Sequence, residues 1–251
     1  MRIAVANQKG GTAKTTTVVN LAAAIAETGL SVLVVDLDAQ ANATTWLGVE
    51  VDKFDTLSVL LREAGIDEAA VPSTVPGVEV VPAVSELSGV ERALAGEVGV
   101  ELRLRAALDR ATPRDVVLLD CLPALSLLTV AGMAAADTVL VPVLPGALEL
   151  EAVAQLLGTV DKVAEALAPD LDVGHLLVCG AGTRTRMDRD VVATLRRRFP
   201  RETMQTVIGR TVRLAEAYAQ RQPITVYDPT GKAAEQYRAA AAELLEARRN
   251  R

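Results

Sequence analysis

The stretch Val5-Ala6-Asn7-Gln8-Lys9-Gly10-Gly11-Thr12-Ala13-Lys14-Thr15-Thr16-Thr17 decides the fold. It follows a short apolar segment, Ile3 to Ala6, which is typical of a buried strand, and it opens a helical run from Thr16 to Glu27. A strand, a glycine-rich turn and a helix in this order predict a phosphate-binding loop, because turn amides and the positive end of the helix dipole both face the anion. In such a loop Lys14 reaches the phosphate oxygens and the Thr15 hydroxyl binds Mg²⁺.

The loop departs from the general pattern at two positions. Ala13 stands where glycine directly precedes the lysine, and Gln8 stands where the first glycine of the loop is expected. If position 13 needs a positive φ, alanine costs about 1 kcal/mol that glycine would not. This cost is small beside the charge-assisted hydrogen bonds that a triphosphate makes, so we interpret the loop as functional. The residues expected to bind the nucleotide here are Gln8, Lys9, Gly10, Gly11, Thr12, Ala13, Lys14, Thr15 and Thr16.

The additional lysine at Lys9 gives the loop a family resemblance. Lys-Gly-Gly-x-x-Lys-Thr-Thr resembles the deviant Walker A motif, KGGxGK[ST]T, of the ParA/Soj and MinD group of ATPases. The resemblance implies ATP or ADP with Mg²⁺ as ligands, and an ATP-dependent homodimer in which Lys9 acts on the partner's nucleotide while Lys14 acts in its own subunit. Two lysines five residues apart on one loop do not easily share a single γ-phosphate, which agrees with this division.

A second motif follows the predicted strand Ser31 to Asp36. Asp36-Leu37-Asp38-Ala39-Gln40-Ala41-Asn42-Ala43-Thr44 resembles the family form DxDPQGNAT, with alanine at positions 39 and 41 in place of proline and glycine. The resemblance implies that Asp38 positions the attacking water or the Mg²⁺ shell. The alternative from the residues alone is that the two carboxylates cap the next helix.

A third carboxylate ends the predicted strand Asp115 to Asp120. Asp120 fits a Walker B aspartate, which holds Mg²⁺ through water. The family continues DxPPS, whereas this chain has Leu122 and Ala124 in place of the first proline and the serine. The expected metal-binding residues are therefore Thr15, Asp38 and Asp120, and the expected catalytic residues are Lys9, Lys14 and Asp38.

Strands alternate with helices along the chain. Further strands are predicted at 78–82, 137–143 and 172–179, and helices at 56–64, 86–108 with a break near Gly96 and Gly99, 147–166 and 233–251. Six strands with a phosphate-binding loop at the first crossover predict an α/β fold: a doubly wound, mostly parallel sheet with helices on both faces and the site at the carboxyl ends of the strands. At 251 residues we expect one domain, residues 1–251.

Composition limits the location and the partners. The apolar share is 50%, yet no run approaches 18 uncharged apolar residues and no signal peptide is present, so we expect a cytoplasmic protein without a membrane span. Cys121 and Cys179 are lone cysteines, which suits a reducing compartment, and His175 lies in an apolar strand and is expected in the core. The net charge of −6 argues against a general nucleic-acid binder, although an average hides local patches.

One segment has the opposite charge. Residues 184–213 contain nine arginines and three carboxylates, a net charge of +6, and arginine without lysine suits phosphate contacts. A solvated helix face is the alternative. Thr206 to Ala217 also resembles the family segment TVIPRNVRLAEA, with Gly209 and Thr211 as departures. The resemblance implies that Ile208 to Thr211 border the adenine, with Ile208 and Arg210 as nucleotide-binding residues, and that arginines of this region contact DNA without sequence preference. The arginines chosen are Arg197, Arg210 and Arg213.

The favoured interpretation is a ParA/Soj-type ATPase of chromosome or plasmid partition. In it an ATP-bound sandwich dimer binds double-stranded DNA, and so associates with the nucleoid, until a ParB-type partner stimulates hydrolysis and release. A MinD-like positioning ATPase is an alternative, disfavoured because the last helix has a mostly alanine face with Leu244 and Leu245 and lacks the bulky residues of a membrane-lying helix. A nucleotide-gated DNA-binding regulator with incidental hydrolysis is the other alternative, which the substituted motif positions leave open.

Overall fold

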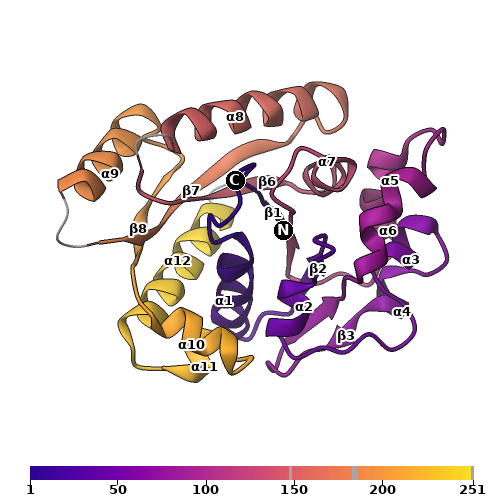
Figure 1. Ribbon diagram of the computed structural model, residues 1–251, viewed down its shortest axis with the longest axis horizontal. Coiled ribbons are helices and arrows are strands. Elements are labelled where there is room, and N and C mark those ends of the chain that lie inside the picture. The colour runs from indigo at the N-terminus through magenta and orange to yellow at the C-terminus, as the bar shows by residue number, and fades with distance from the viewer. Residues whose placement is uncertain (147–148, 183–185, 250–251) are drawn as a thin grey trace.

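A computed structural model shows a central twisted sheet with helices on both faces (Figure 1). The structure describes residues 1–146, 149–182 and 186–249. Within these residues eight strands lie in the order β3-β4-β2-β5-β1-β6-β7-β8, and every neighbouring pair is parallel except β3 and β4. The strands are β1 (Arg2–Val5), β2 (Val32–Asp36), β3 (Val71–Pro72), β4 (Val78–Val81), β5 (Val116–Asp120), β6 (Thr138–Val143), β7 (Asp172–Ala181) and β8 (Thr203–Gly209).

Helices connect the strands and cover the sheet. Two short 3₁₀ turns, η1 (Ser85–Gly89) and η2 (Val100–Leu102), accompany them. The α-helices are α1 (Lys14–Ala26), α2 (Asn42–Trp46), α3 (Thr56–Leu61), α4 (Ile66–Ala69), α5 (Val90–Ala93), α6 (Arg103–Arg110), α7 (Leu127–Ala134), α8 (Glu149–Ala166), α9 (Arg186–Arg198), α10 (Arg213–Ala219), α11 (Ile224–Tyr227) and α12 (Lys232–Arg249).

The sheet separates two hydrophobic cores, because successive side chains of a strand point to opposite faces. On one face Ala4 and Leu119 pack with residues from α6, α7, α8 and α9. On the other face Ile3 and Leu118 pack with residues from α1, α2 and α12. Helices α1 and α12 lie against each other on that second face, while α8 crosses the first (Figure 1). Both faces are covered, which explains why β2 and β5 are uninterrupted apolar runs up to their final aspartates.

The strand register brings the three predicted motifs to one edge of the sheet. Strand β1 lies between β5 and β6, so the loop after Val5 leaves the sheet at its centre. Asp36 and Asp120 are direct register partners at the ends of β2 and β5. Val5 is in turn the register partner of Asp120. The doubly wound parallel fold is therefore confirmed, with its motifs at the carboxyl ends of adjacent strands.

Several boundaries differ from the predictions. The first helix begins at Lys14 rather than Thr16, and the region 86–108 is divided into four short helical segments around Gly96 and Gly99, as the predicted break indicated. Strands β3 and β8 were not predicted, because β3 has two residues and β8 (TMQTVIG) mixes polar and apolar residues. The predicted helix start at residue 147 and the predicted helix end at residue 251 lie outside the described residues.

Three findings bear on the expectations drawn from composition. Cys121 and Cys179 are free, buried thiols. His175 is buried within β7, as expected. No helix among the described residues has the length and apolar character needed to cross a bilayer.

Candidate nucleotide-binding site

The phosphate-binding loop is held to the sheet and to α8 by side-chain hydrogen bonds. Asn7, which is buried, donates from Nδ2 to the Pro142 carbonyl at the end of β6, with a distance of 2.9 Å, and its Oδ1 accepts from the Lys9 amide at 3.1 Å. Gln8 donates from Nε2 to the Thr159 hydroxyl of α8 at 3.0 Å. These contacts are available to Asn and Gln but not to glycine, so Gln8 anchors the loop where a glycine was expected.

The residue directly before Lys14 has a left-handed backbone. Ala13 is the N-cap of α1 with φ 66° and ψ 28°, and its carbonyl accepts from the Thr17 amide at 2.8 Å. Gly11 also has a positive φ of 73°. The condition for backbone strain at position 13 is therefore met, and alanine costs about 1 kcal/mol relative to glycine at this point.

The two loop lysines occupy different environments. Lys14 is only 7% exposed, and its Nζ donates to the Lys9 carbonyl at 3.3 Å. Burial lowers the pKa of Lys14, and the neighbouring Asp120 carboxylate is the largest influence that raises it. Lys9 lies on the surface. One lysine thus faces the interior of its own site while the other faces outward.

Asp36 organises the loop that follows β2. Its fully buried carboxylate accepts hydrogen bonds from the Thr44 amide at 2.9 Å, the Thr44 hydroxyl at 2.8 Å and the Asp38 amide at 3.1 Å. Burial raises the pKa of Asp36 to about 6, and the Thr44 hydrogen bonds oppose that rise. Since Thr44 lies in the first turn of α2, the helix-capping alternative is correct for Asp36.

Asp38 does not cap the helix. Its Oδ1 accepts from the Gln40 amide at 3.0 Å, and it lines a cavity beside the phosphate-binding loop. The N-cap of α2 is instead Ala41, with φ 50° and ψ 36°. Ala41 stands where the resembled motif has glycine, as does Ala13, so both substituted glycine positions have the left-handed backbone that glycine tolerates best.

Asp120 is a buried carboxylate at the end of β5. It is 1% exposed, and neither oxygen has a partner within hydrogen-bonding geometry among the described residues. Burial raises the pKa of Asp120 well above its ordinary value, the adjacent Asp36 raises it further, and the nearby Thr15 hydroxyl and Lys14 ammonium act in the opposite direction. Such an orphaned carboxylate next to a threonine hydroxyl fits a divalent cation, which takes oxygen ligands.

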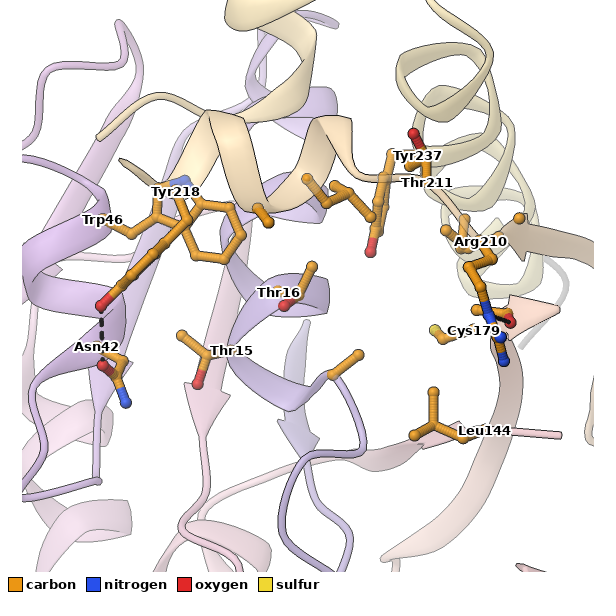
Figure 2. Close-up of a pocket in the computed structure, with 16 residues that line it drawn as sticks. Thr15, Thr16, Asn42, Trp46, Leu144, Cys179, Arg210, Thr211, Tyr218 and Tyr237 are labelled. Carbon is orange, nitrogen blue, oxygen red and sulfur yellow. Dashed lines mark hydrogen bonds between the residues drawn. The ribbon is translucent and has the colours of Figure 1, made fainter. Parts of the chain in front are cut away.

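Two adjoining cavities extend from the loop. One, of about 440 Å³, is lined by Lys14 and Asp38 together with residues of the loop, and the other, of about 540 Å³, is largely apolar. The larger cavity, drawn in Figure 2, opens between the start of α1, the end of β8 and helix α10. The two cavities share Ala13, Thr15, Thr16 and Asn42. A polar cavity continuous with an apolar one matches the phosphates and the base of a nucleotide.

The larger cavity brings together residues that the motifs did not identify. Trp46 and Tyr218 form an edge-to-face pair with ring centroids 5.0 Å apart, and the Tyr218 hydroxyl donates to Asn42 Oδ1 at 3.2 Å (Figure 2). Cys179 and Tyr237 lie on the inner wall. Trp46 is the one tryptophan of a chain with 2% aromatic residues, and this rarity was the signal in the sequence that could have identified it as a site residue. Nothing in the sequence marked Tyr237.

The structure places the resembled segment after β8 beside this cavity. Ile208, Arg210 and Thr211 all line it. The Arg210 amide donates to the Ala181 carbonyl at 3.0 Å, and its Nε donates to the Gly180 carbonyl at 3.4 Å. This segment therefore lies beside the apolar cavity, and its contact with a base stays a prediction.

The three arginines chosen for DNA contact do not form one cluster. Arg197 is exposed in the last turn of α9, before β8, whereas Arg210 follows β8. The residue before Arg197, Arg196, donates to the Gln205 carbonyl within β8 at 2.9 Å, whereas Arg210 lines the larger cavity. Arg213 pairs with Glu216 at 3.0 Å and with Asp228 at 3.9 Å. Arg184, the first arginine of the segment, lies outside the described residues.

The chain is similar to known proteins over nearly its whole length. A family model described as an AAA domain matches residues 1–173. The chain is 43% identical over 244 residues to the chromosome-partitioning ATPase Soj of Thermus thermophilus, and the match covers 97% of this chain and 95% of the relative.

Two solved structures share the architecture. A cobyrinic acid a,c-diamide synthase from Mycobacterium smegmatis, solved with an ATP analogue and magnesium, superposes with a TM-score of 0.84 at 36% identity, over 97% of this chain and 93% of the other. The cell-division ATPase MinD of Pyrococcus furiosus superposes with a TM-score of 0.82 at 23% identity, over 98% of both chains, which shows the fold alone.

Proposed function

Because the chain belongs to the ParA/Soj family of partition ATPases, we propose that it hydrolyses ATP to drive the segregation of DNA. In this proposal ATP joins two subunits, the dimer binds double-stranded DNA without sequence preference, and a ParB-type partner stimulates hydrolysis and releases the DNA. The observation that carries the proposal is the paired cavity, whose polar end holds the buried Lys14 beside Asp120, a carboxylate with no hydrogen-bond partner in the described part of the chain.

The polar end supports binding of the phosphates with Mg²⁺. Loop amides and Lys14 Nζ would contact the phosphates, and the Thr15 hydroxyl and Asp120 are the groups that would hold the ion, Asp120 through water. Bound Mg²⁺ supplies neutralisation of the charge that develops on the phosphate oxygens. The mycobacterial relative, 36% identical, was solved with an ATP analogue and magnesium, which supports the same ligands here.

The hydrolytic step is assigned to Asp38. Its carboxylate lines the phosphate cavity and accepts one hydrogen bond from the Gln40 amide, which limits its orientation. From there Asp38 orients the attacking water, while the Asp36 carboxylate holds the Asp38 amide. Asp38 therefore acts on the water rather than on the affinity for ATP.

The family and the exposure of Lys9 support the proposed dimer. Lys9 is on the surface of the loop, a position that supports contact with a partner subunit's nucleotide. Partition is favoured over the amide synthesis named for the mycobacterial structure, because the Soj relative has the higher identity, 43% against 36%, over a similar length.

Three variants test the enzymatic part of the proposal. Lys14→Ala should abolish ATP binding measured by calorimetry, because Lys14 supplies the main cationic contact to the phosphates. Asp38→Ala should retain ATP and DNA binding but lose phosphate release. Lys162→Ala, an exposed lysine of α8, is the matched control and should behave as wild type. Unchanged ATP affinity in Lys14→Ala, or normal turnover in Asp38→Ala, would contradict the assignment.

Lys9→Ala tests the dimer separately. We expect the variant to bind ATP as a monomer but to fail to dimerise with a non-hydrolysable analogue in analytical ultracentrifugation. A full dimer in that experiment would show that Lys9 does not act across an interface. DNA-stimulated and partner-stimulated turnover in wild type, compared with DNA binding by Asp38→Ala, distinguishes a partition ATPase from a regulator whose hydrolysis is incidental.

A further inference from the structure

Asn42 is at the junction of the two cavities. It is the first residue of α2 and lines both the polar cavity, with Lys14 and Asp38, and the apolar cavity, with Ile208. In a nucleotide that spans the two cavities, the sugar and the first phosphate lie at this junction. Asn42 is half-buried, so its amide is within reach of a ligand.

The side-chain amide of Asn42 already accepts a hydrogen bond at its oxygen. The Tyr218 hydroxyl donates to Asn42 Oδ1 at 3.2 Å, a contact that joins residues 176 positions apart (Figure 2). Asparagine offers an acceptor oxygen and a donor NH₂ group, and a hydroxyl donor on the oxygen determines which end is which. The Nδ2 hydrogens are then the end that remains for a ligand oxygen.

The tyrosine that orients this amide is itself held in place. Tyr218 is 41% exposed, and an exposed aromatic ring would ordinarily sample several rotamers. Here the ring packs edge-to-face on Trp46, at 5.0 Å between centroids and 80° between planes. Trp46 is 4% exposed, and its Nε1–H donates to the Gln222 carbonyl at 2.7 Å, so α2 is tied to the segment after α10.

We propose that Tyr218 is a positioning residue that acts through Asn42: it orients the Asn42 amide so that Nδ2 donates to an oxygen of the nucleotide where the sugar meets the phosphates. This inference rests on the proposed binding of ATP. Neither side chain belongs to the hydrolytic step. Both contribute to the affinity for ATP and ADP alike, since the two nucleotides share the sugar and the first phosphate.

The first variant removes only the hydroxyl. Tyr218→Phe keeps the ring on Trp46 but frees the Asn42 amide to rotate, and we expect ATP and ADP to bind about fivefold more weakly in calorimetry. Turnover at saturating ATP should stay at the wild-type rate, so that KM rises while kcat does not. Tyr227→Phe is the matched control, because its hydroxyl donates to Glu216 and does not line the cavity.

The second variant separates the donor from the acceptor. Asn42→Asp retains an oxygen for the Tyr218 hydroxyl but replaces the NH₂ group with a charged oxygen beside the phosphates, so we expect a loss of more than about tenfold in affinity for both nucleotides. An Asn42→Asp variant that binds both nucleotides as tightly as wild type would overturn the inference, because neither the lost donor nor the new charge would then face the nucleotide.

A double-mutant cycle decides whether the two residues act as one unit. With Asn42→Ala as background, Tyr218→Phe should cause no further loss of ATP affinity, because its effect passes through Asn42. Additive losses would overturn the inference. Thermal unfolding without nucleotide checks that each variant folds. Failure of wild type to bind ATP would refute the proposed function itself, whereas normal ATP binding by wild type and by all three variants would refute this inference alone.

Discussion

Two alanines show what single residues do to this site. Ala13 and Ala41 are the N-caps of α1 and α2, and both have positive φ, at 66° and 50°. The left-handed backbone costs alanine roughly 1–2 kcal/mol, which glycine avoids. At the two positions where the resembled motifs have glycine and this chain has alanine, alanine therefore carries local backbone strain.

Replacing these alanines with glycine should stabilise the protein. Glycine relieves the left-handed strain but gains freedom in the unfolded chain, so Ala13→Gly and Ala41→Gly should each raise the free energy of unfolding by about 0.5–1 kcal/mol. Urea unfolding without nucleotide measures the effect. Ala239→Gly, on the exposed side of α12, is the control and should cost about 1 kcal/mol. For Ala13→Gly we also expect ATP affinity that is equal to wild type or tighter by at most about 1 kcal/mol. If both substitutions destabilised the protein, alanine would not be strained at these two N-cap positions.

Asp120 provides a pH-dependent prediction at the same scale. Its folded-state pKa is raised well above the ordinary 3.8, so the unfolded chain releases the proton at lower pH than the folded protein does. The stability associated with protonated Asp120 is then present at acid pH and lost as pH rises through the folded pKa. Asp120→Asn should therefore be more stable than wild type at pH 7, without nucleotide, and this advantage should shrink as pH falls toward 4.

Thermal unfolding of both proteins across that pH range measures the difference. Added Mg²⁺ and ATP should reverse the order, because Asp120→Asn lacks the carboxylate that would hold the ion. If the stability advantage of Asp120→Asn grew as pH fell, burial of the ionised Asp120 carboxylate would not be what destabilises wild type.

At the scale of elements, side chains of α12 cover one edge of the sheet. Strand β8 is the last strand in the sheet order, and its outward amides meet acceptors on α12. Glu243 accepts from the Gln205 amide at 2.7 Å and the Thr206 amide at 3.0 Å, and Gln236 accepts from the Gly209 amide at 3.0 Å. Side chains thus take the place of a further strand, which prevents edge-to-edge association.

Removing one of these acceptors should weaken the edge. Glu243→Ala leaves two backbone N–H groups to water, so we expect a decrease of about 1–2 kcal/mol in the free energy of unfolding and more self-association on concentration. Urea unfolding and light scattering measure the two effects. Glu246→Ala, an exposed glutamate on the same helix, is the control. Equal stability of the two variants would show that the edge does not depend on Glu243.

At the scale of the whole molecule, the proposed DNA binding of an acidic protein requires a local basic surface. The arginines chosen for this role differ in their surroundings. Arg197 is exposed on α9, whereas Arg210 lines the proposed base cavity and Arg213 pairs with Glu216. Arg197 therefore gives the cleanest test, because changing Arg210 also alters the nucleotide site.

Arg197→Glu should weaken ATP-dependent binding to any DNA duplex and leave ATP affinity unchanged. For every arginine–phosphate interaction that a substitution removes, the slope of log affinity against log salt should become shallower by about 0.9. A salt titration of duplex binding with ATP present measures this slope for wild type, Arg197→Glu, Arg210→Glu and Arg213→Glu. A dimer doubles a weak surface, so binding should also require ATP. Wild-type slopes in all three variants, or equal binding without nucleotide, would contradict the DNA-binding proposal.

The sequence by itself determined the parallel fold and the polar half of the site. Two buried apolar runs that end in Asp36 and Asp120, and a glycine-rich loop before a helix, are local patterns with local causes. The phosphate-binding loop and the sheet type could therefore be predicted. The tertiary structure decided what no local pattern contains. It assigned Asp36 to hold a loop and Asp38 to face the cavity, although both share one motif. It also placed Trp46 and Tyr218 together over Asn42, because residues about 170 positions apart meet only when α2 and α10 pack on the same face of the sheet.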